Sequence, residues 1–285
     1  MKTRIISGAI AAAALYFIML LPPYVMGLTV FAVSIIALYE FYQCVRKVDF
    51  NPIRIVGFFA CIMFLLYLTY KTFLIDSSIA LFKNISQVIF QQNMFYLFVY
   101  LSIVYLLLQM VFHRKSFNLN DIAVTFLGIV YIPFLLSFLF QVRFLENGFE
   151  FVWLIFVGTF STDICAYFIG KFFGRSKIIP KISPNKTVEG TIGGAVGSVV
   201  FTTLYGVLYI NGYEELNIAV YHFIALGIIC GTISQLGDWS ASAIKRNVGI
   251  KDFGHIIPGH GGLLDRIDSL LFVAPAVYFY IQFLL

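Results

Sequence analysis

Long apolar runs, each about long enough to cross a membrane as a helix, recur along the whole chain and constrain its fold most. A hydrocarbon core about 30 Å thick needs roughly 20 such residues in a helix. Hydrophobic residues make up 60% of the 285 residues and charged residues only 12%, about half the charged share of a soluble domain. Polar side chains could not cover so apolar a chain, so lipid must solvate much of it. The sequence therefore predicts an all-α, polytopic membrane protein.

Nine transmembrane helices can be placed on these runs. The predicted spans cover residues 5–21, 26–43, 54–71, 92–112, 121–141, 150–170, 189–210, 218–239 and 266–284. The segment 72–91 is ambiguous, because Lys83 and Asn84 interrupt its apolar part, and it also fits an interfacial helix. We divide the chain into N-terminal spans 1 to 5 in residues 1–145 and a C-terminal region of spans 6 to 9, with their cytoplasmic links, in residues 146–285. Together they are expected to form one integral-membrane domain.

The distribution of Lys and Arg predicts the orientation of these spans, because such residues favour the cytoplasmic side. With the N-terminus in the cytoplasm, nine spans place sixteen of the nineteen Lys and Arg residues on the cytoplasmic side. The opposite side receives only Lys71, Lys83 and Arg143. The asymmetry therefore predicts a cytoplasmic N-terminus and an odd number of spans.

Residues 242–268 carry an unusual density of charge for this chain. They include seven charged residues and five glycines in 27 positions, whereas the other 258 positions hold 26 charged residues. A solvated loop would account for the lysines. It would not account for Asp265 and Asp268, which open an apolar run three positions apart and so share a helix face, at a depth where ionised groups indicate function. The glycines form a tight turn or let backbone N–H groups approach a ligand, and the helix start after them favours an anion.

Two further aspartates fall at the cytoplasmic ends of predicted spans. Asp238 lies at the end of the span 218–239, and Asp163 lies in the cytoplasmic half of the span 150–170. Asp163 could instead be a packing residue that is hydrogen-bonded to Ser or Thr. Four carboxylates at one depth, beside many Lys and Arg residues, suit Mg²⁺, which binds few carboxylates together with phosphate oxygens of a substrate.

A second polar segment occupies residues 174–190. Ser183, which a proline follows, suits the N-cap of a helix. Lys186 and Glu189 lie three positions apart and could form a surface ion pair of little energetic value. Alternatively, Lys186 and Arg175 could bind phosphates where this helix begins. Spacing alone leaves both interpretations open.

The pattern in residues 242–268 resembles the signature of the phosphatidate cytidylyltransferases, or CDP-diacylglycerol synthases. Residues 183–190, with Asp163 ahead of them, resemble a second motif of that family, although Asn185 stands where a lysine is more usual. The resemblance is specific over about residues 160–275, whereas the first five spans match only in hydropathy. It implies a reaction in which CTP and phosphatidate give CDP-diacylglycerol and pyrophosphate, in phospholipid biosynthesis.

The resemblance also implies roles for individual residues. The predicted catalytic residues are Asp238, Asp265, Asp268, Lys245 and Arg246. The predicted substrate-binding residues are Arg175, Ser183, Lys186, Glu189, Lys251, His260, Gly261, Gly262 and Arg266. Mg²⁺, as one ion or a pair, would be held by Asp238 and Asp265, with Asp163 and Asp268 in direct contact or just behind. His260 fits a hydrogen-bonding loop residue equally well, and some basic residues could only anchor helices at the interface.

CTP and phosphatidate would then be the substrates, with membrane lipids as further partners, no nucleic acid, and a homodimer by analogy alone. One substrate is a lipid and the other a soluble polyanion, so we expect an integral protein of the cell inner (plasma) membrane whose site faces the cytoplasm. The nucleophile would be the phosphate monoester oxygen of phosphatidate, which is largely dianionic near neutral pH because its second pKa is about 6. No strong base is then needed, and catalysis would consist of positioning and charge neutralisation.

Other classes of function fit the sequence less well. A related membrane enzyme could use CTP with another acceptor, such as an isoprenoid alcohol, whose hydroxyl would need a general base. An ion-coupled transporter also has intramembrane aspartates and glycine-broken helices, but its polar site would lie near the membrane midplane. Zinc and redox chemistry have little support, because the four cysteines show no metal-ligand or disulfide spacing.

Overall fold

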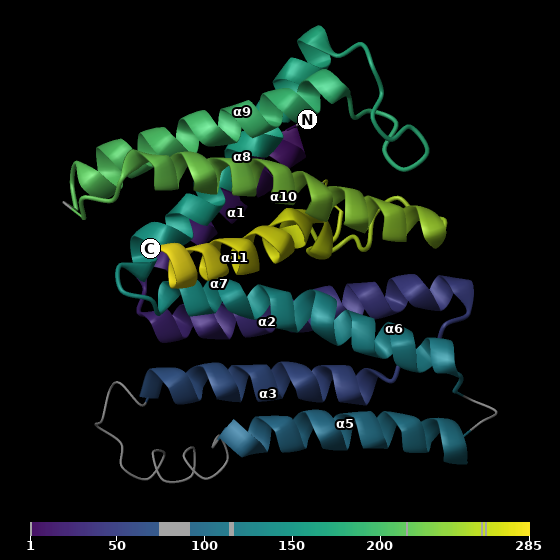
Figure 1. The fold of residues 1–285 in the computed structure, drawn as a ribbon. Coiled ribbons are helices and arrows are strands. Elements are labelled where there is room, and N and C mark those ends of the chain that lie inside the picture. Colours follow the sequence, from purple (N-terminus) through teal and green to yellow (C-terminus); the bar gives the residue numbers. More distant parts are fainter. Residues whose placement is uncertain (1, 74–91, 114–116, 215, 258, 260) are drawn as a thin grey trace. The chain divides into compact units, whose positions relative to one another are not determined.

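The computed structural model describes residues 2–285 except 74–91, 114–116, 215, 258 and 260 (Figure 1). The regular elements of the described residues are all helical, which confirms the predicted all-α class. The helices are α1 (Lys2–Leu20), α2 (Pro23–Val45), α3 (Arg54–Phe73), α5 (Gln92–Phe112), α6 (Leu119–Ile129), α7 (Leu135–Arg143), α8 (Gly148–Phe173), α9 (Val188–Tyr205), α10 (Val220–Asn247) and α11 (Leu264–Leu284). Short turns of 3₁₀ or π-helix add η1 (Arg46–Val48), η2 (Val130–Phe134) and η3 (Gly206–Asn211).

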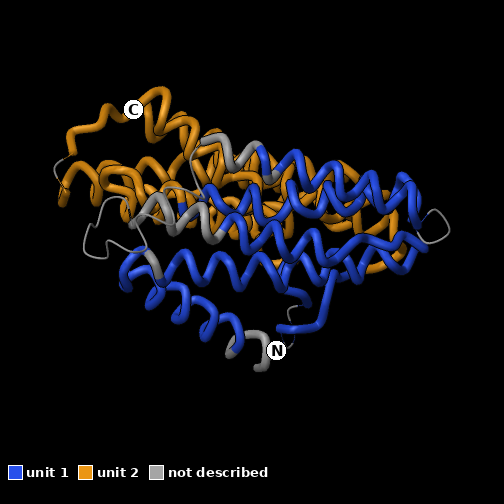
Figure 2. The backbone as a smooth tube through the Cα atoms, turned by 90° about the horizontal axis from the view of Figure 1, so that it is seen from below, with its two compact units in different colours: residues 1–140, 252–264 blue, residues 141–251, 265–285 orange. Residues whose placement is uncertain are grey.

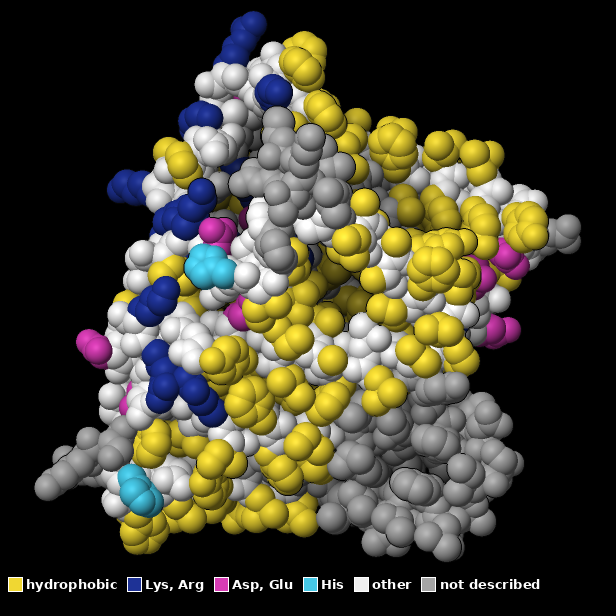
Figure 3. Space-filling view, turned by 180° about the vertical axis from the view of Figure 1, so that it is seen from behind, with side chains coloured by type: hydrophobic (Ala, Val, Ile, Leu, Met, Phe, Trp, Pro, Cys, Tyr) yellow, Lys and Arg dark blue, Asp and Glu magenta, His cyan; other side chains and the backbone are white. Residues whose placement is uncertain are grey.

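Six helical segments of the described chain are long and apolar enough to cross a membrane. They are Val25–Val48, Leu119–Arg143, Gly148–Phe173, Val188–Asn211, Val220–Asn247 and Leu264–Leu284. Each overlaps a predicted span, and shorter apolar helices coincide with the other three predicted spans. Hydrophobic side chains also cover much of the surface seen in Figure 3, as lipid contact requires. The protein is thus polytopic with six candidate spans, while the nine-span topology and the cytoplasmic N-terminus remain predictions. The ambiguous segment 72–91 lies outside the described residues apart from its first two positions.

The chain divides into two compact units (Figure 2). Unit 1 contains residues 1–140 and 252–264, and unit 2 contains residues 141–251 and 265–285. The division after residue 145 into two parts of one integral-membrane domain stays a prediction. All of the predicted catalytic and metal-binding residues belong to unit 2.

In unit 1, α2 and the link that follows it are both fixed to α6 by hydrogen bonds. The backbone N–H of Asn51 donates to Oδ1 of Asp121 at 2.5 Å, and the Tyr42 hydroxyl donates to the backbone carbonyl of Thr125 at 3.0 Å. Further along, α6 continues through η2 into α7. Pro133 lies within η2; because proline has no N–H and crowds the preceding turn, it interrupts regular α-helical hydrogen bonding there.

In unit 2, glycines let α8, α9 and α10 pack with their backbones close together. A Cβ atom on Gly194 of α9 would lie 2.9 Å from the carbonyl oxygen of Thr162 and 3.0 Å from the Cβ of Ala166, both on α8. A Cβ on Gly231 of α10 would lie 2.8 Å from the Cα of Ala195 on α9. Small residues of this kind are what membrane helices use to approach one another. The three helices that carry or flank the predicted site are therefore held at a close, fixed spacing.

We expect Gly194→Val to lower both the melting temperature in detergent and the activity. The added side chain would force α9 away from the backbone of α8, and such overpacking costs about 1–3 kcal/mol. Val200→Leu is a matched control on the same helix, because Val200 is 54% exposed, and it should melt like the wild type. A Gly194→Val protein that also melts like the wild type would contradict the close α8–α9 contact.

Candidate active site

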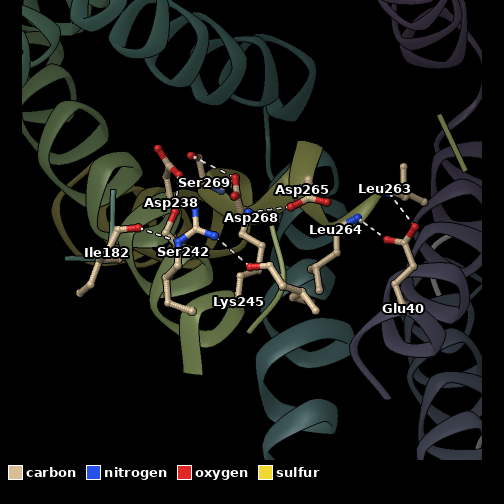
Figure 4. A network of polar contacts seen from close by, with 12 residues as sticks. Glu40, Ile182, Asp238, Ser242, Lys245, Leu263, Leu264, Asp265, Asp268 and Ser269 are labelled. Atoms are coloured by element: carbon tan, nitrogen blue, oxygen red, sulfur yellow. Dashed lines mark hydrogen bonds and ion pairs between the residues drawn. The ribbon is translucent and has the colours of Figure 1, made fainter. Parts of the chain in front are cut away.

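Asp238 of α10 forms an ion pair with Lys186, which lies in the link between α8 and α9. The two side chains are 32% and 25% exposed, so the pair is reachable from solvent. The Lys186 ammonium also lies 5.8 Å from the ring centroid of Trp239. On the other side of the carboxylate, the Ser242 hydroxyl lies 3.4 Å from Oδ1 of Asp238 (Figure 4). The fold thus joins the two polar segments that the sequence singled out.

A second ion pair joins the end of α10 to the start of α11. The Lys245 ammonium donates to Oδ1 of Asp265 at 2.7 Å, and their side chains are only 11% and 3% exposed (Figure 4). Removing two charges from water costs several kcal/mol each, which only a close partner can offset. The pair therefore links the two helices and fixes the position of Asp265.

Asp268 and Asp163 extend this cluster of carboxylates. Asp268 is buried on α11 and Asp163 is exposed on α8, and both lie within electrostatic range of Asp238 and of each other. A Cβ on Gly237 would lie 2.7 Å from the backbone oxygen of Asp268. Because a glycine stands there, α11 can approach α10 directly beside Asp238. Three carboxylates from three helices thus gather at one place in unit 2.

Glu189, in the first turn of α9, holds the link that precedes this helix. Its carboxylate accepts hydrogen bonds from the backbone N–H of Arg175 at 3.0 Å and of Ser176 at 3.2 Å. Lys186 pairs with Asp238 rather than with Glu189. The Lys186–Glu189 ion pair that their spacing allowed does not form, and each of the two side chains has other partners. Glu189 therefore holds the backbone at Arg175 in place.

The predicted N-cap at Ser183 is wrong. Helix α9 begins at Val188, and its N-cap is Thr187, whose hydroxyl accepts a hydrogen bond from the N–H of Gly190 at 3.1 Å. Threonine caps helices nearly as well as serine, and Thr187 has the extended backbone that an N-cap needs, with φ −120° and ψ 154°. Ser183 instead lies among turns within the link.

The Arg246 guanidinium binds backbone carbonyl groups. Its Nε donates to the oxygen of Ile182 at 3.1 Å, and its Nη1 donates to the oxygen of Ile250 at 2.9 Å. These bonds tie the end of α10 to the link before α9. Three other predicted basic residues are exposed, namely Arg175, Lys251 and Arg266.

The glycine-rich segment before α11, in unit 1, closes into a turn. The N–H of Ile257 donates to the carbonyl oxygen of Gly261 at 3.0 Å. Gly259 and Gly261 have φ angles of 78° and 84°, which glycine adopts far more readily than other residues. The turn interpretation of these glycines is therefore supported, while His260 lies outside the described residues.

Sequence reasoning missed Glu40, a buried carboxylate on α2 in unit 1. It accepts hydrogen bonds from the N–H groups of Leu263 at 3.0 Å and Leu264 at 2.8 Å, where α11 begins. The anion expected at this helix start is thus supplied by the protein itself. An acidic residue within the apolar span 26–43 was the available signal.

The chain as a whole is similar to known proteins. The chain matches the model of the cytidylyltransferase family over residues 2–284. It belongs to that family. It is similar to the phosphatidate cytidylyltransferase of Bacillus subtilis (strain 168), with 32% identity over 284 residues that cover 98% of this chain and 97% of that protein. It also resembles the phosphatidate cytidylyltransferase of Synechocystis sp., with 31% identity over 316 residues that cover 99% of this chain and 97% of that protein.

A further relative, the phosphatidate cytidylyltransferase of Staphylococcus aureus (strain COL), is 36% identical over 165 residues, or 58% of this chain and 61% of that protein. Because the family model and the first two relatives match nearly the whole chain, the family resemblance extends beyond residues 160–275 and includes the first five predicted spans. In this cytidylyltransferase, unit 2 gathers many of the predicted site residues, namely Asp163, Lys186, Asp238, Lys245, Asp265, Asp268 and Arg266. Gly261 and Gly262 belong to unit 1.

Members of the cytidylyltransferase family generally use Mg²⁺, and the residues present suit that ion. In the part of the chain that the structure describes, no three His, Cys, Asp or Glu side chains converge closely enough to hold a metal alone. Mg²⁺ does not need such a cage, because it commonly binds one or two carboxylates and completes its shell with water and substrate phosphate. Asp238, half-exposed and close to Asp163 and Asp268, fits this chemistry.

Proposed function

We propose that this protein transfers the cytidylyl group of CTP to phosphatidate, giving CDP-diacylglycerol and pyrophosphate, at the cytoplasmic boundary of the cell membrane. One observation carries the proposal. Carboxylate and ammonium groups gather around Asp238 among membrane-type helices, in a chain related over nearly its full length to proteins named for this activity. A site of this kind can serve a lipid substrate and a soluble polyanion together.

The reaction requires the protein to stabilise charge and does not require a nucleophilic side chain. An oxygen of the phosphatidate phosphate attacks the α-phosphorus of CTP, and the bond to the departing pyrophosphate breaks. The attacking monoester is largely dianionic near neutral pH, since its second pKa is about 6, so no residue has to remove a proton. The task of the protein is to bring two polyanions together and to stabilise the charge that develops on the leaving group.

Asp238 would hold Mg²⁺, with Asp163 and Asp268 beside it in electrostatic range. When bound, the ion neutralises phosphate charge and aligns the reacting oxygens. Asp265 keeps its predicted metal-binding role as part of this proposal, and its contact in the structure is with Lys245. The raised density of negative charge around Asp238 is what favours a divalent cation here.

The basic residues fall into two groups, those that can reach a phosphate and one that is bonded to the backbone. Lys186 shares the site with Asp238, and the exposed residues Arg175, Lys251 and Arg266 can reach phosphates from solvent. We assign these four to binding the triphosphate and the lipid phosphate. Arg246 is committed to backbone carbonyl groups, so we assign it a positioning role. A homodimer remains a prediction by analogy.

The proposal is tested with the purified protein in detergent, CTP labelled in its cytidine, phosphatidate and Mg²⁺. We expect CDP-diacylglycerol and pyrophosphate in equal amounts, no product after chelation of Mg²⁺, and recovery when Mg²⁺ is restored. Diacylglycerol, which lacks the phosphate nucleophile, is the matched control and should give no nucleotide-linked lipid. Absence of CDP-lipid from phosphatidate, or phosphorylation of diacylglycerol or an isoprenoid alcohol instead, would overturn the assignment.

A further inference from the structure

Glu40 is a carboxylate in an unusual position for a membrane protein. It lies on α2 within the candidate span Val25–Val48 and is only 3% exposed. A buried ionised group is costly unless hydrogen bonds compensate for the lost water. Here each carboxylate oxygen accepts from a different backbone N–H, Oε1 from Leu263 at 3.0 Å and Oε2 from Leu264 at 2.8 Å (Figure 4).

These two N–H groups belong to the start of α11. The first N–H groups of a helix have no acceptor within the helix, and the aligned peptide dipoles favour a negative charge at this end. Glu40 meets both needs from a helix more than 220 positions earlier in the chain, since the two bonds span 223 and 224 residues. The start of α11 is therefore anchored to α2.

Two glycines make room for this carboxylate. A Cβ on Gly262 would lie 2.7 Å from both oxygens of Glu40, and a Cβ on Gly254 would lie 2.7 Å from its Cδ. Neither glycine has a φ angle in the left-handed range, so crowding is the constraint on both: Glu40 supplies all three of the nearest atoms at Gly254, and at Gly262 it shares that place with the backbone N of Gly254, also 2.7 Å away. The segment 252–264 is thus shaped around Glu40 at two points.

The anchor reaches the proposed site through the chain itself. Asp265 follows Leu264 directly in the sequence, and consecutive Cα atoms are fixed about 3.8 Å apart. A shift of Leu264 therefore also shifts Asp265 and strains its ion pair with Lys245. Misplacing a catalytic group by about 1 Å can cost about 100-fold in rate.

We propose that Glu40 is a positioning residue for the cytidylyl transfer. Its carboxylate holds the first N–H groups of α11, and this contact fixes the place of Asp265. Glu40 acts through the backbone and does not touch substrate. The effect of Glu40 on the reaction rate rests on the proposed function, whereas its effect on amide hydrogen exchange, which the test also measures, does not.

The test compares Glu40→Gln with Ser34→Ala. Glutamine keeps the size of the side chain but turns an NH₂ group towards one of the two N–H donors. Ser34 is also buried on α2, where its hydroxyl donates to the carbonyl oxygen of Val30. We expect Glu40→Gln to lower kcat about 10- to 100-fold, to raise the Mg²⁺ concentration for half-maximal rate, and to speed amide hydrogen exchange in residues 252–264. Ser34→Ala should match the wild type in all three.

A purely structural role for Glu40 predicts a different pattern. It would lower the fraction of folded protein and speed exchange across α2 and α3 alike, while leaving the Mg²⁺ dependence of the remaining activity unchanged. That pattern, or wild-type kinetics in Glu40→Gln, would overturn the proposal. An inactive wild-type protein would instead count against the proposed function, and the exchange of residues 252–264 would still decide whether Glu40 anchors α11.

Gly254→Ala, which keeps Glu40, covers the case in which Glu40→Gln fails to fold, and a double variant tests the contact itself. Gly254→Ala places a methyl group against the Glu40 carboxylate and should reproduce the loss of kcat and the faster exchange. In a Glu40→Ala background the carboxylate that the methyl group would meet is gone. Gly254→Ala should then lower kcat by less than about a further threefold, because the effects of substitutions at residues in direct contact are not additive. If the double variant instead loses kcat by the product of the two single fold-losses, Glu40 and Gly254 do not act through their contact, and the proposal is wrong.

Discussion

Replacing Asp238 with asparagine is expected to lower kcat about 100-fold or more while leaving the protein folded. Asparagine has nearly the same shape but no charge, so the carboxylate proposed to bind Mg²⁺ is lost, and a 100-fold loss corresponds to about 2.7 kcal/mol of transition-state stabilisation. Stability should change little. Asp238 and Lys186 are each partly exposed, and ion pairs of that kind are worth about 1 kcal/mol or less.

The measurement is the rate of CDP-diacylglycerol formation across a range of Mg²⁺ concentrations, together with the melting temperature in detergent. Asp49→Asn is a matched control, because Asp49 is exposed and has a φ angle of 62°, a conformation that asparagine also tolerates. It should keep wild-type activity. If Asp238→Asn retains more than a tenth of the wild-type rate, Asp238 is not a metal ligand in the reaction.

The positions of the helices could be predicted from the sequence because lipid imposes a strong length rule. Each span needs about 20 apolar residues, and the run that predicted a span at 150–170 became α8, Gly148–Phe173. The same contrast indicated the candidate site, because Asp163 and Asp238 stand out in apolar surroundings. Their proximity to Asp268 was expected, because the predicted topology put all three aspartates at one depth.

The partners of these residues could not be predicted in the same way. Lys186 lies three positions from Glu189 but pairs with Asp238, which is 52 positions away, because glycine-mediated packing of α8, α9 and α10 decides which side chains meet. Ser183 and Thr187 are both good caps, and only the path of the link selects the second. Glu40 itself was a signal, as an acidic residue in an apolar span, but its partners are backbone N–H groups, so nothing in the sequence indicated what it binds.

The buried pair between Lys245 and Asp265 should give the largest change in stability. Lys245→Met or Asp265→Leu alone is expected to lower the free energy of unfolding by about 3–5 kcal/mol, since each leaves one buried charge without its counter-ion. The double variant should regain most of that loss, because apolar residues of similar size often replace a buried ion pair at little cost. Denaturation of the four proteins in the same detergent provides the measurement. Lys181→Met, at an exposed lysine, is the control and should stay within about 0.5 kcal/mol of the wild type.

Activity then separates the structural part of this pair from its chemical part. If Asp265 binds metal or orients phosphate, the stable double variant stays at least about 100-fold below the wild type, because its fold is restored and its carboxylate is not. If the pair only joins α10 to α11, activity returns together with stability. A double variant that is both stable and active would remove Asp265 from the proposed metal site, leaving Asp238 with Asp163 and Asp268 as the carboxylates that hold Mg²⁺.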